Sequence, residues 1–350
     1  VKDYRYVAKY SNKKRENGGH LMKFLGRILV VLFSCLLFAF PALAAPQDQY
    51  KLPEPYMSLE QNYLKAFPEL QKVMNIMIEK TAQQIKNPEQ DILHNRVCSA
   101  LVYKMAVDNK LSAKFQKLAV AGDLLHNISK EDKKDVLTDP GLLNQADLMV
   151  TRLKKAGYFR NSPNFWKDKG IFAQPKIGNN LSLIHHITGA LRVGQMLKEI
   201  GGFSKKEVEL VEVGVLEHST GYWYFRSSIN EVIGSNNAWA IAYPAPENDL
   251  AKLIHDADLI SQFVPESVVP EGSKWRVLAT KRWKAKTTKE EADIVYYVFK
   301  LLYDEAKTEA GKRLAKEKWD QIAPELIKLM GLQPGDDPIE KLGVPAIFQK

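Results

Sequence analysis

Residues 124–130, LLHNISK, end a predicted helix that begins near Ser112 and runs to about residue 128. Ser112 is the expected N-cap, because a serine side chain can accept a hydrogen bond from the first free backbone N–H groups. His126 stands among apolar and small residues rather than on a solvated face. A single histidine in such a place is usually a core residue, but a buried imidazole needs hydrogen-bond partners.

Four other segments share this character and come in a definite order. They are His94-Asn95-Arg96-Val97, His185 followed by Gly189-Ala190, Glu217-His218-Ser219-Thr220-Gly221, and Asp256-Ala257-Asp258-Leu259. Each lies on or at the end of a predicted helix. A shared metal ion would give these side chains a common partner, since imidazole and carboxylate are frequent ligands of transition metals. The five segments together predict a metal centre.

This ordered set resembles the HD superfamily of metal-dependent phosphohydrolases, over about residues 90–262. The likeness is closest to the branch that hydrolyses dinucleoside polyphosphates, which also has a histidine four residues before Gly-Ala and a His-Thr-Thr-Gly segment like 218–221. Segment 304–330 is similar to the C-terminal helix of other HD hydrolases. The resemblance implies an all-α helical bundle, with one or two ions of Fe, Mn, Zn or Ni as cofactor.

The resemblance also implies a set of ligand positions, which are His94, His126, Asn127, His185, His218 and Asp258. His185 is preferred to His186 for its spacing to Gly189, and neighbours on a helix point about 100° apart. Asp258 is preferred to Asp256 because the order Ala-Asp-Leu matches the family. His255 could support a ligand from behind.

Asn127 departs from the family, which has a bridging aspartate at this position. A neutral amide offers one oxygen and no charge. Three outcomes are open: one ion held by His94, His126 and Asp258, compensation by Asp123 one helical turn earlier, or a degenerate site that binds without turnover. Catalytic roles are assigned accordingly to Asp258, Asp123 and Lys130.

Several residues are candidates for substrate binding, each with a structural alternative. Lys130 could contact phosphate or simply interact favourably with the C-terminal end of its helix. Arg96 could bind substrate or pair with a carboxylate, and His186 is a further candidate. Tyr222, Trp223 and Arg226 could stack on a base and bind a phosphate, or could fill the core under a loop.

The rest of the chain is expected to be helical as well. Three regions are predicted after the N-terminal segment. They are a helical extension over 45–87, an HD domain over 88–265 with an insertion at about 131–180, and C-terminal helices over 266–350 that pack on the HD domain. The aromatic segment 157–180 could be a lid or a packed loop. Helical patterns occupy about 59–86, 88–109, 112–128, 141–156, 181–200, 204–219, 247–262, 287–307 and 310–330.

Charge and hydropathy at the N-terminus predict export. Residues 1–44 have a local charge of +6 out of the total of +9, which leaves +3 for the rest and argues against a nucleic-acid partner. From Met22, a basic start, the apolar run 28–40 and Ala42-Leu43-Ala44 resemble a signal peptide cleaved near Ala44, with 1–21 as translated leader. We therefore expect a periplasmic or secreted protein with no membrane anchor after cleavage. Cys98, the one cysteine left, is expected in the core and cannot form a disulfide within the chain.

Two function classes follow from these patterns. The first is a phosphohydrolase that acts on a nucleotide or another small phosphoester through metal-activated water. The second is a binding or regulatory module with the same fold but without full catalysis. This alternative stays open because Asn127 replaces the aspartate that the resemblance implies.

Overall fold

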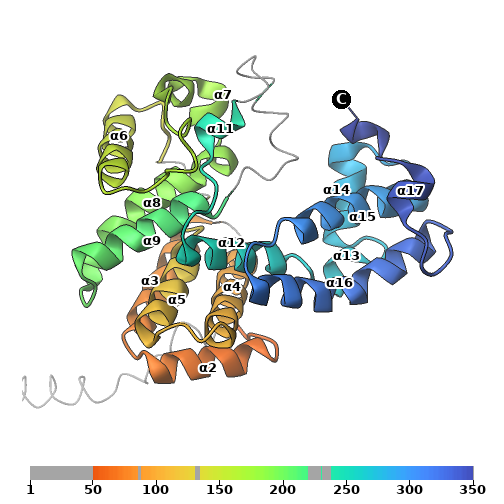
Figure 1. The fold of residues 1–350 in the computed structure, drawn as a ribbon, viewed down its shortest axis with the longest axis horizontal. Coiled ribbons are helices and arrows are strands. Elements are labelled where there is room, and N and C mark those ends of the chain that lie inside the picture. Colours follow the sequence, from red (N-terminus) through yellow and green to blue (C-terminus); the bar gives the residue numbers. More distant parts are fainter. Residues whose placement is uncertain (1–49, 86–87, 131–134, 220–229, 231–237, 350) are drawn as a thin grey trace, which may run out of the picture. The chain divides into compact units, whose positions relative to one another are not determined.

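The computed structural model describes residues 50–85, 88–130, 135–219, 230 and 238–349. All regular elements in these ranges are helices, which confirms the all-α class expected from the sequence (Figure 1). They are α2 (Tyr56–Ala66), α3 (Leu70–Gln84), α4 (Glu89–Asp108), α5 (Ala113–Leu125), α6 (Pro140–Lys155), η2 (Lys169–Ala173), α7 (Pro175–Gly178), α8 (Leu181–Ile200), α9 (Lys205–Glu217), α11 (Trp239–Ala242), α12 (Asp249–Ser261), α13 (Pro265–Val268), α14 (Lys274–Trp283), α15 (Thr288–Asp304), α16 (Glu309–Leu329), α17 (Pro338–Leu342) and η3 (Ala346–Phe348).

The chain divides into two units, Val1–Ala45 and Pro46–Lys350. The predicted leader and signal peptide lie outside the described residues. Among the described residues, no helix is long and apolar enough to cross a lipid bilayer.

The helical pattern expected over 59–86 is interrupted at Pro68. Phe67 ends α2 with φ −136° and ψ 75°, and α3 starts after Glu69. A proline disfavours helical backbone at the residue before it and has no N–H to donate, so one continuous helix is not possible here.

Helix α12 lies at the centre of the helices that bring the motif residues together (Figure 1). It contacts α4, α5 and α9, and its Leu250, Leu253, Ile254 and Ile260 are buried. Apolar side chains of α12 are thus packed against the three neighbouring helices. Asp258 is therefore held on a well-packed helix rather than on a loop.

Helix α8 approaches the end of α5 closely, at the Gly-Ala pair of the predicted motif. A Cβ at Gly189 would lie 3.3 Å from the carbonyl oxygen of His126, tighter than an ordinary contact. Nearby, the hydroxyls of Ser129 and Thr188 are 2.7 Å apart and form a hydrogen bond. The glycine thus allows α8 to pack against the turn that contains His126 and Asn127.

The C-terminal helices are joined to α12 by Asp256. Its carboxylate accepts hydrogen bonds from the backbone N–H groups of Lys307 (2.8 Å) and Thr308 (2.7 Å), at the start of α16. These contacts give Asp256 a structural role. Helix α14 precedes α15 and α16 and was not expected from the sequence.

The aromatic segment 157–180 is a packed loop rather than a lid over the site. Phe165 and Phe172 are fully buried, and Trp166 stacks on Phe172 with ring centroids 4.8 Å apart. The backbone N–H of Trp166 donates to Ile241 O at 2.9 Å. These contacts hold the segment against α11.

Candidate metal centre

His126 is positioned by the end of α5. It is the C-cap residue of that helix, and its Nδ1 lies 2.7 Å from the carbonyl oxygen of Asp123. A carbonyl only accepts, so Nδ1 has the ring hydrogen and Nε2 has the lone pair. That Nε2 lies 3.7 Å from Asp258 Oδ1.

His94 faces the same carboxylate from α4. Its Nε2 lies 3.2 Å from Asp258 Oδ1, and its Nδ1 lies 3.2 Å from Ser261 Oγ. The Ser261 hydroxyl donates its own hydrogen to Asp258 O at 2.6 Å, so His94 Nδ1–H is the donor to Ser261. The lone pairs of two imidazoles and a carboxylate oxygen therefore converge.

The electrostatics of these groups favour a cation. Burial lowers the pKa of His94, more strongly than Asp258 raises it. Burial alone would raise the pKa of Asp258, but hydrogen bonds from His126 and His94 and positive charge on these two rings outweigh this and hold that pKa well below the usual value. A metal ion on the same ring nitrogens would supply that positive charge in place of the protons. Near neutral pH the centre thus has an anionic carboxylate beside a neutral His94.

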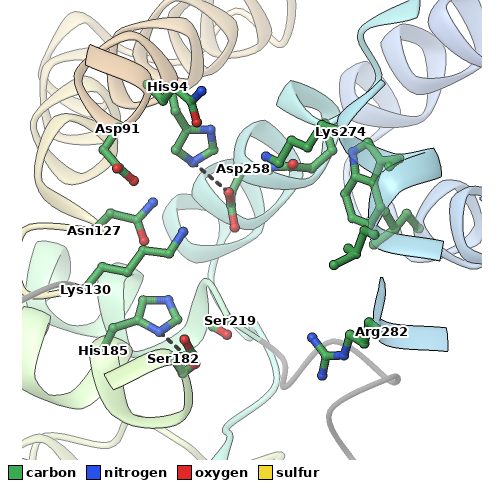
Figure 2. Close-up of a pocket in the computed structure, with 15 residues that line it drawn as sticks. Asp91, His94, Asn127, Lys130, Ser182, His185, Ser219, Asp258, Lys274 and Arg282 are labelled. Carbon is green, nitrogen blue, oxygen red and sulfur yellow. Dashed lines mark hydrogen bonds and ion pairs between the residues drawn. The ribbon is translucent and has the colours of Figure 1, made fainter. Parts of the chain in front are cut away.

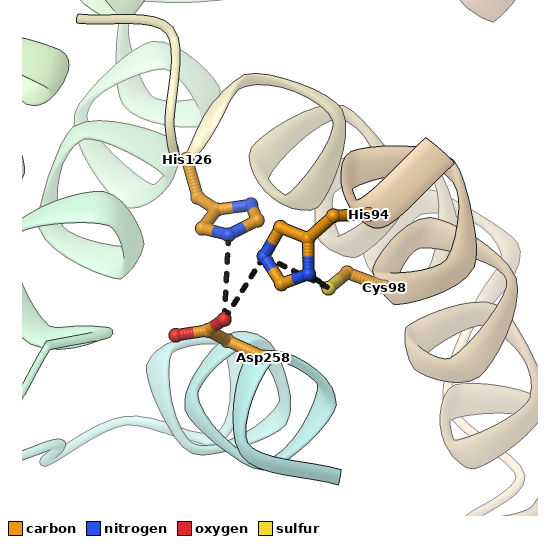
Figure 3. Close-up of side chains that lie close together, drawn as sticks. All are labelled: His94, Cys98, His126 and Asp258. Atoms are coloured by element: carbon orange, nitrogen blue, oxygen red, sulfur yellow. Dashed lines mark hydrogen bonds and ion pairs between the residues drawn. The ribbon is translucent and has the colours of Figure 1, made fainter. Parts of the chain in front are cut away.

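Cys98 completes the group, one turn after His94 on α4 (Figure 3). One ligand atom from each of His94, Cys98, His126 and Asp258 can be chosen so that all lie within 4.8 Å of one another. These four residues form a group that could bind a metal ion. Cys98 is buried as expected. Its place in this group was not predicted, and the His-x-x-x-Cys spacing on one helix was the signal for it.

The position of Cys98 Sγ differs from that of the other three donors. It lies 3.7 Å from both ring nitrogens of His94, so it contacts the ring between them rather than beside Nε2. Burial raises the pKa of the Cys98 thiol well above its usual value.

His185 and His218 form a second pair of imidazoles. Their Nε2 atoms are 3.1 Å apart, while their Nδ1 atoms donate to Ser182 O (3.2 Å) and Val215 O (2.6 Å). Burial lowers the pKa of His218 to about 3 and that of His185 well below its usual value. Two neutral rings thus have Nε2 lone pairs that face each other.

The two groups are connected through His126. The ring centroids of His94 and His126 are 5.4 Å apart, those of His126 and His218 5.1 Å, and those of His218 and His185 5.0 Å. The structure therefore brings together all four histidines that the resemblance implies.

Asn127 lies beside His126 at the edge of the centre. Its Nδ2 is 2.7 Å from His126 Nε2, in the direction that a metal ion on this nitrogen would occupy. An ion would require the amide to turn, which would present Oδ1 instead.

A cavity of about 280 Å³ opens onto this centre (Figure 2). His94, Asn127, Lys130, His185 and Asp258 line it, together with residues of α14. Lys274 and Arg282 on α14 also line the cavity, as does Asp91 in the first turn of α4; none of the three was expected from the sequence.

Asp123 does not join the metal group. Its Oδ1 lies 3.5 Å from His126 Nδ1, on the opposite side of the ring from the lone pair that faces Asp258. Both carboxyl oxygens lack a hydrogen-bond partner among the described residues. Burial, aided by the charge of Asp258, raises the pKa of Asp123 well above its usual value. An ion on His126 Nε2 is out of its reach, so the predicted compensation for Asn127 has no geometric basis.

Arg96 and His186 do not line the cavity, and the predicted substrate contacts are corrected accordingly. The buried Arg96 guanidinium pairs with Glu60 of α2, with Nε–Oε2 2.7 Å and Nη2–Oε1 2.5 Å, which is the carboxylate pairing considered as its alternative. His186 Nε2 donates to Ala242 O at 2.9 Å, and its ring stacks on Tyr243. Burial lowers the pKa of His186 to about 4.

The remaining predicted contacts fall into two classes. Tyr222, Trp223 and Arg226 lie outside the described residues. His255 is behind the centre, where its Nδ1 donates to His218 O at 2.9 Å. It supports the end of α9 and does not face the cavity.

Comparison of the chain with protein-family models, with curated proteins and with solved structures finds no match. The resemblance to the HD superfamily therefore rests on the ordered motifs alone.

Proposed function

We propose that this chain is an exported HD-type phosphohydrolase that uses one divalent metal ion to hydrolyse a small phosphoester. The main support is the convergence of His94 Nε2, His126 Nε2 and Asp258 Oδ1 at a cavity with two lysines. The predicted periplasmic or secreted location is part of the proposal.

The spacing of the donors suits a metal ion. Tetrahedral ligands about 2.0 Å from an ion lie roughly 3.3 Å from each other. The two nitrogen–oxygen separations here are 3.2 and 3.7 Å. His94, His126 and Asp258 would hold the ion, and three protein ligands leave a fourth position for water or substrate, as in catalytic zinc sites.

A bound divalent ion would polarise a phosphoryl oxygen and lower the pKa of water. Asp258 would supply the negative charge that holds the ion, and Ser261 and the Asp123 carbonyl fix the orientation of the two imidazoles. Lys130 would neutralise charge on the phosphoryl group within the cavity. His185 also lines the cavity, and burial lowers its pKa, so its neutral imidazole could accept a proton from water.

A single ion fits this donor set better than two. Asp258 is the anionic ligand that remains of the two in the family, because Asn127 is neutral. A second ion on His185 and His218 would have only imidazoles from this pair. The charge of a second cation would then be poorly compensated.

Cys98 supports the alternative function, a binding or regulatory module without turnover. If its sulfur ionised and moved onto the ion, four protein ligands would close the coordination shell, as in structural zinc sites. Its contact between the two nitrogens of His94, away from Nε2, favours the open site.

The test is metal analysis of the purified protein together with phosphate release from a panel of phosphomonoesters and phosphodiesters. We expect about one metal per chain and metal-dependent turnover. Asp258→Asn should lose both. Asp249→Asn is the matched control, because Asp249 is on the same helix and exposed to solvent.

Metal-free native protein would overturn the proposal. Metal-loaded protein with no turnover on any phosphoester would favour the module.

A further inference from the structure

One face of α14 extends from the metal centre along the cavity wall. Lys274, Trp275, Leu278 and Arg282 all line the cavity. Lys274, Leu278 and Arg282 are spaced four residues apart, so they follow one stripe of the helix. The stripe has a cation at each end and apolar side chains between them.

Lys274, at the end of the stripe nearest to Asp258, is placed to contact the phosphoryl group that would react at the metal ion. Loss of surrounding water lowers the pKa of Lys274, and the charge of Lys130 lowers it further. Asp258 and Asp91 act on Lys274 in the opposite direction. Figure 2 shows Lys274 beside Asp258, with Arg282 away from it on the cavity wall.

Lys130 and Lys274 line the cavity and can interact with an anionic ligand. Neither Lys130 Nζ nor Lys274 Nζ forms a hydrogen bond or ion pair with a side chain among the described residues. Asp91 and Asp258 are the acids among the described residues that line the cavity, and Asp258 is assigned to the metal ion. The cavity therefore favours anionic groups.

The far end lies beyond the reach of a single phosphate. Arg282 follows Lys274 by eight residues, which corresponds to about 12 Å along a helix. A phosphoryl group held at the metal end would therefore be too far from Arg282 along the cavity wall to share its contact with Lys274. Trp275, Leu278 and the buried Leu302 line the wall between them.

We propose that the substrate has two anionic groups separated by an apolar spacer, and that Arg282 binds the group that does not react. Lys274 then acts with Lys130 on the reacting phosphoryl group. Arg282 is a specificity residue, because it would contact only the distal anion. This inference rests on the proposed function and defines its substrate class.

The probes are hexyl phosphate and hexane-1,6-diol bisphosphate, which share a spacer and differ in the second phosphate. Binding to the metal-loaded full-length protein is measured by calorimetry, and hydrolysis by phosphate release. We expect the bisphosphate to bind about tenfold more tightly, because a charge-assisted contact contributes this much. Arg282→Gln should remove that difference and leave the Kd for hexyl phosphate unchanged.

Lys281→Gln is the matched control, because Lys281 is an exposed cation on the same helix and does not line the cavity. It should keep the preference for the bisphosphate. Arg282→Glu should weaken the bisphosphate further and spare hexyl phosphate.

Equal affinity of the native protein for the two probes would overturn the inference, and turnover of hexyl phosphate would then leave the proposed hydrolase intact. A preference that survives Arg282→Gln would also overturn it. Binding with the expected preference but without hydrolysis would instead contradict the hydrolase and support the binding module.

Discussion

His94 Nε2 and Asp258 Oδ1 lie 3.2 Å apart, and the ring hydrogen of His94 is on its other nitrogen. Two acceptors at this distance repel each other unless a proton or a cation lies between them. The burial that lowers the pKa of His94 disfavours the proton. A metal ion bound to both atoms would therefore stabilise the packing of α4 against α12 at this point.

Asn127→Asp should increase metal binding. The new carboxylate would stand where the Asn127 amide now donates to His126 Nε2, and it would add the negative charge that the HD resemblance implies at this position. We expect the metal content per chain to rise, with a second ion near His185 and His218. Elemental analysis after dialysis measures this, and an unchanged ratio would show that charge at residue 127 does not limit the site.

Cys98→Ala should separate an open metal site from a closed one. If the thiol is not a ligand, the variant keeps its metal and its turnover, and loses only about 1 kcal/mol of stability from a small cavity. Cobalt-loaded native protein should then lack the near-ultraviolet charge-transfer band of a cobalt thiolate. A band that disappears in Cys98→Ala, together with loss of metal, would contradict the open site.

How far the sequence predicts this centre depends on the type of signal. The resemblance carried by the ordered motifs implied that His94, His126, His185, His218 and Asp258 are neighbours, and in the structure these side chains lie close together. Arg96 was harder, because its role depends on long-range packing. Asp123 lies on the Nδ1 side of the His126 ring, which its position one helical turn earlier did not reveal. The burial of Arg96 against Glu60 of α2 cannot be inferred from its two-residue separation from His94.

The contribution of α14 shows a different difficulty. Its sequence, KWRVLATKRW, mixes cations with aromatic and β-branched residues and has little helical periodicity of apolar residues. Its helix depends on packing against α15, with Trp275 in edge contact with Phe299. Lys274 and Arg282 could be placed at the cavity only once this packing was known.

Arg96→Ala should destabilise the fold without affecting the intrinsic chemistry. It would leave the buried Glu60 carboxylate unpaired, which typically costs about 3–5 kcal/mol. Urea denaturation measures the loss, and Lys104→Ala is the control, since the Lys104–Asp108 pair on the same helix is exposed and is expected to contribute less than about 1 kcal/mol. A large rise in substrate KM with unchanged stability would instead restore Arg96 as a substrate contact.

Asp256→Ala and Asp258→Asn should have opposite signatures. Asp256 accepts from Lys307 N, Thr308 N and Thr308 Oγ1, so its removal should lower the free energy of unfolding by about 1–3 kcal/mol. The folded Asp256→Ala variant should keep its metal content, whereas Asp258→Asn should lose the metal. Calorimetry and elemental analysis on both variants test this, and metal loss in Asp256→Ala at full stability would reverse the assignment.

Glu217 should make the native state less stable as the pH rises. Burial raises the pKa of this carboxyl to about 8 from 4.5, with one oxygen accepting from Glu247 N at 3.0 Å and the other unpartnered among the described residues. Below pH 4.5 the group is protonated in both states and makes no difference. Between pH 4.5 and 8 the unfolded chain has lost this proton while the folded chain keeps it, so stability falls by up to about 1.4 kcal/mol per pH unit.

Glu217→Gln isolates this effect, because glutamine keeps the acceptor for Glu247 N and cannot ionise. We expect its free energy of unfolding, measured in urea at pH 5, 6, 7 and 8, to fall less steeply than that of the native protein. The gap between the two should widen in favour of the variant up to pH 8 and then stay constant, because above that pH the carboxyl is ionised in both states. Parallel curves would mean that Glu217 is already ionised in the folded protein, with a cation or water beside its second oxygen.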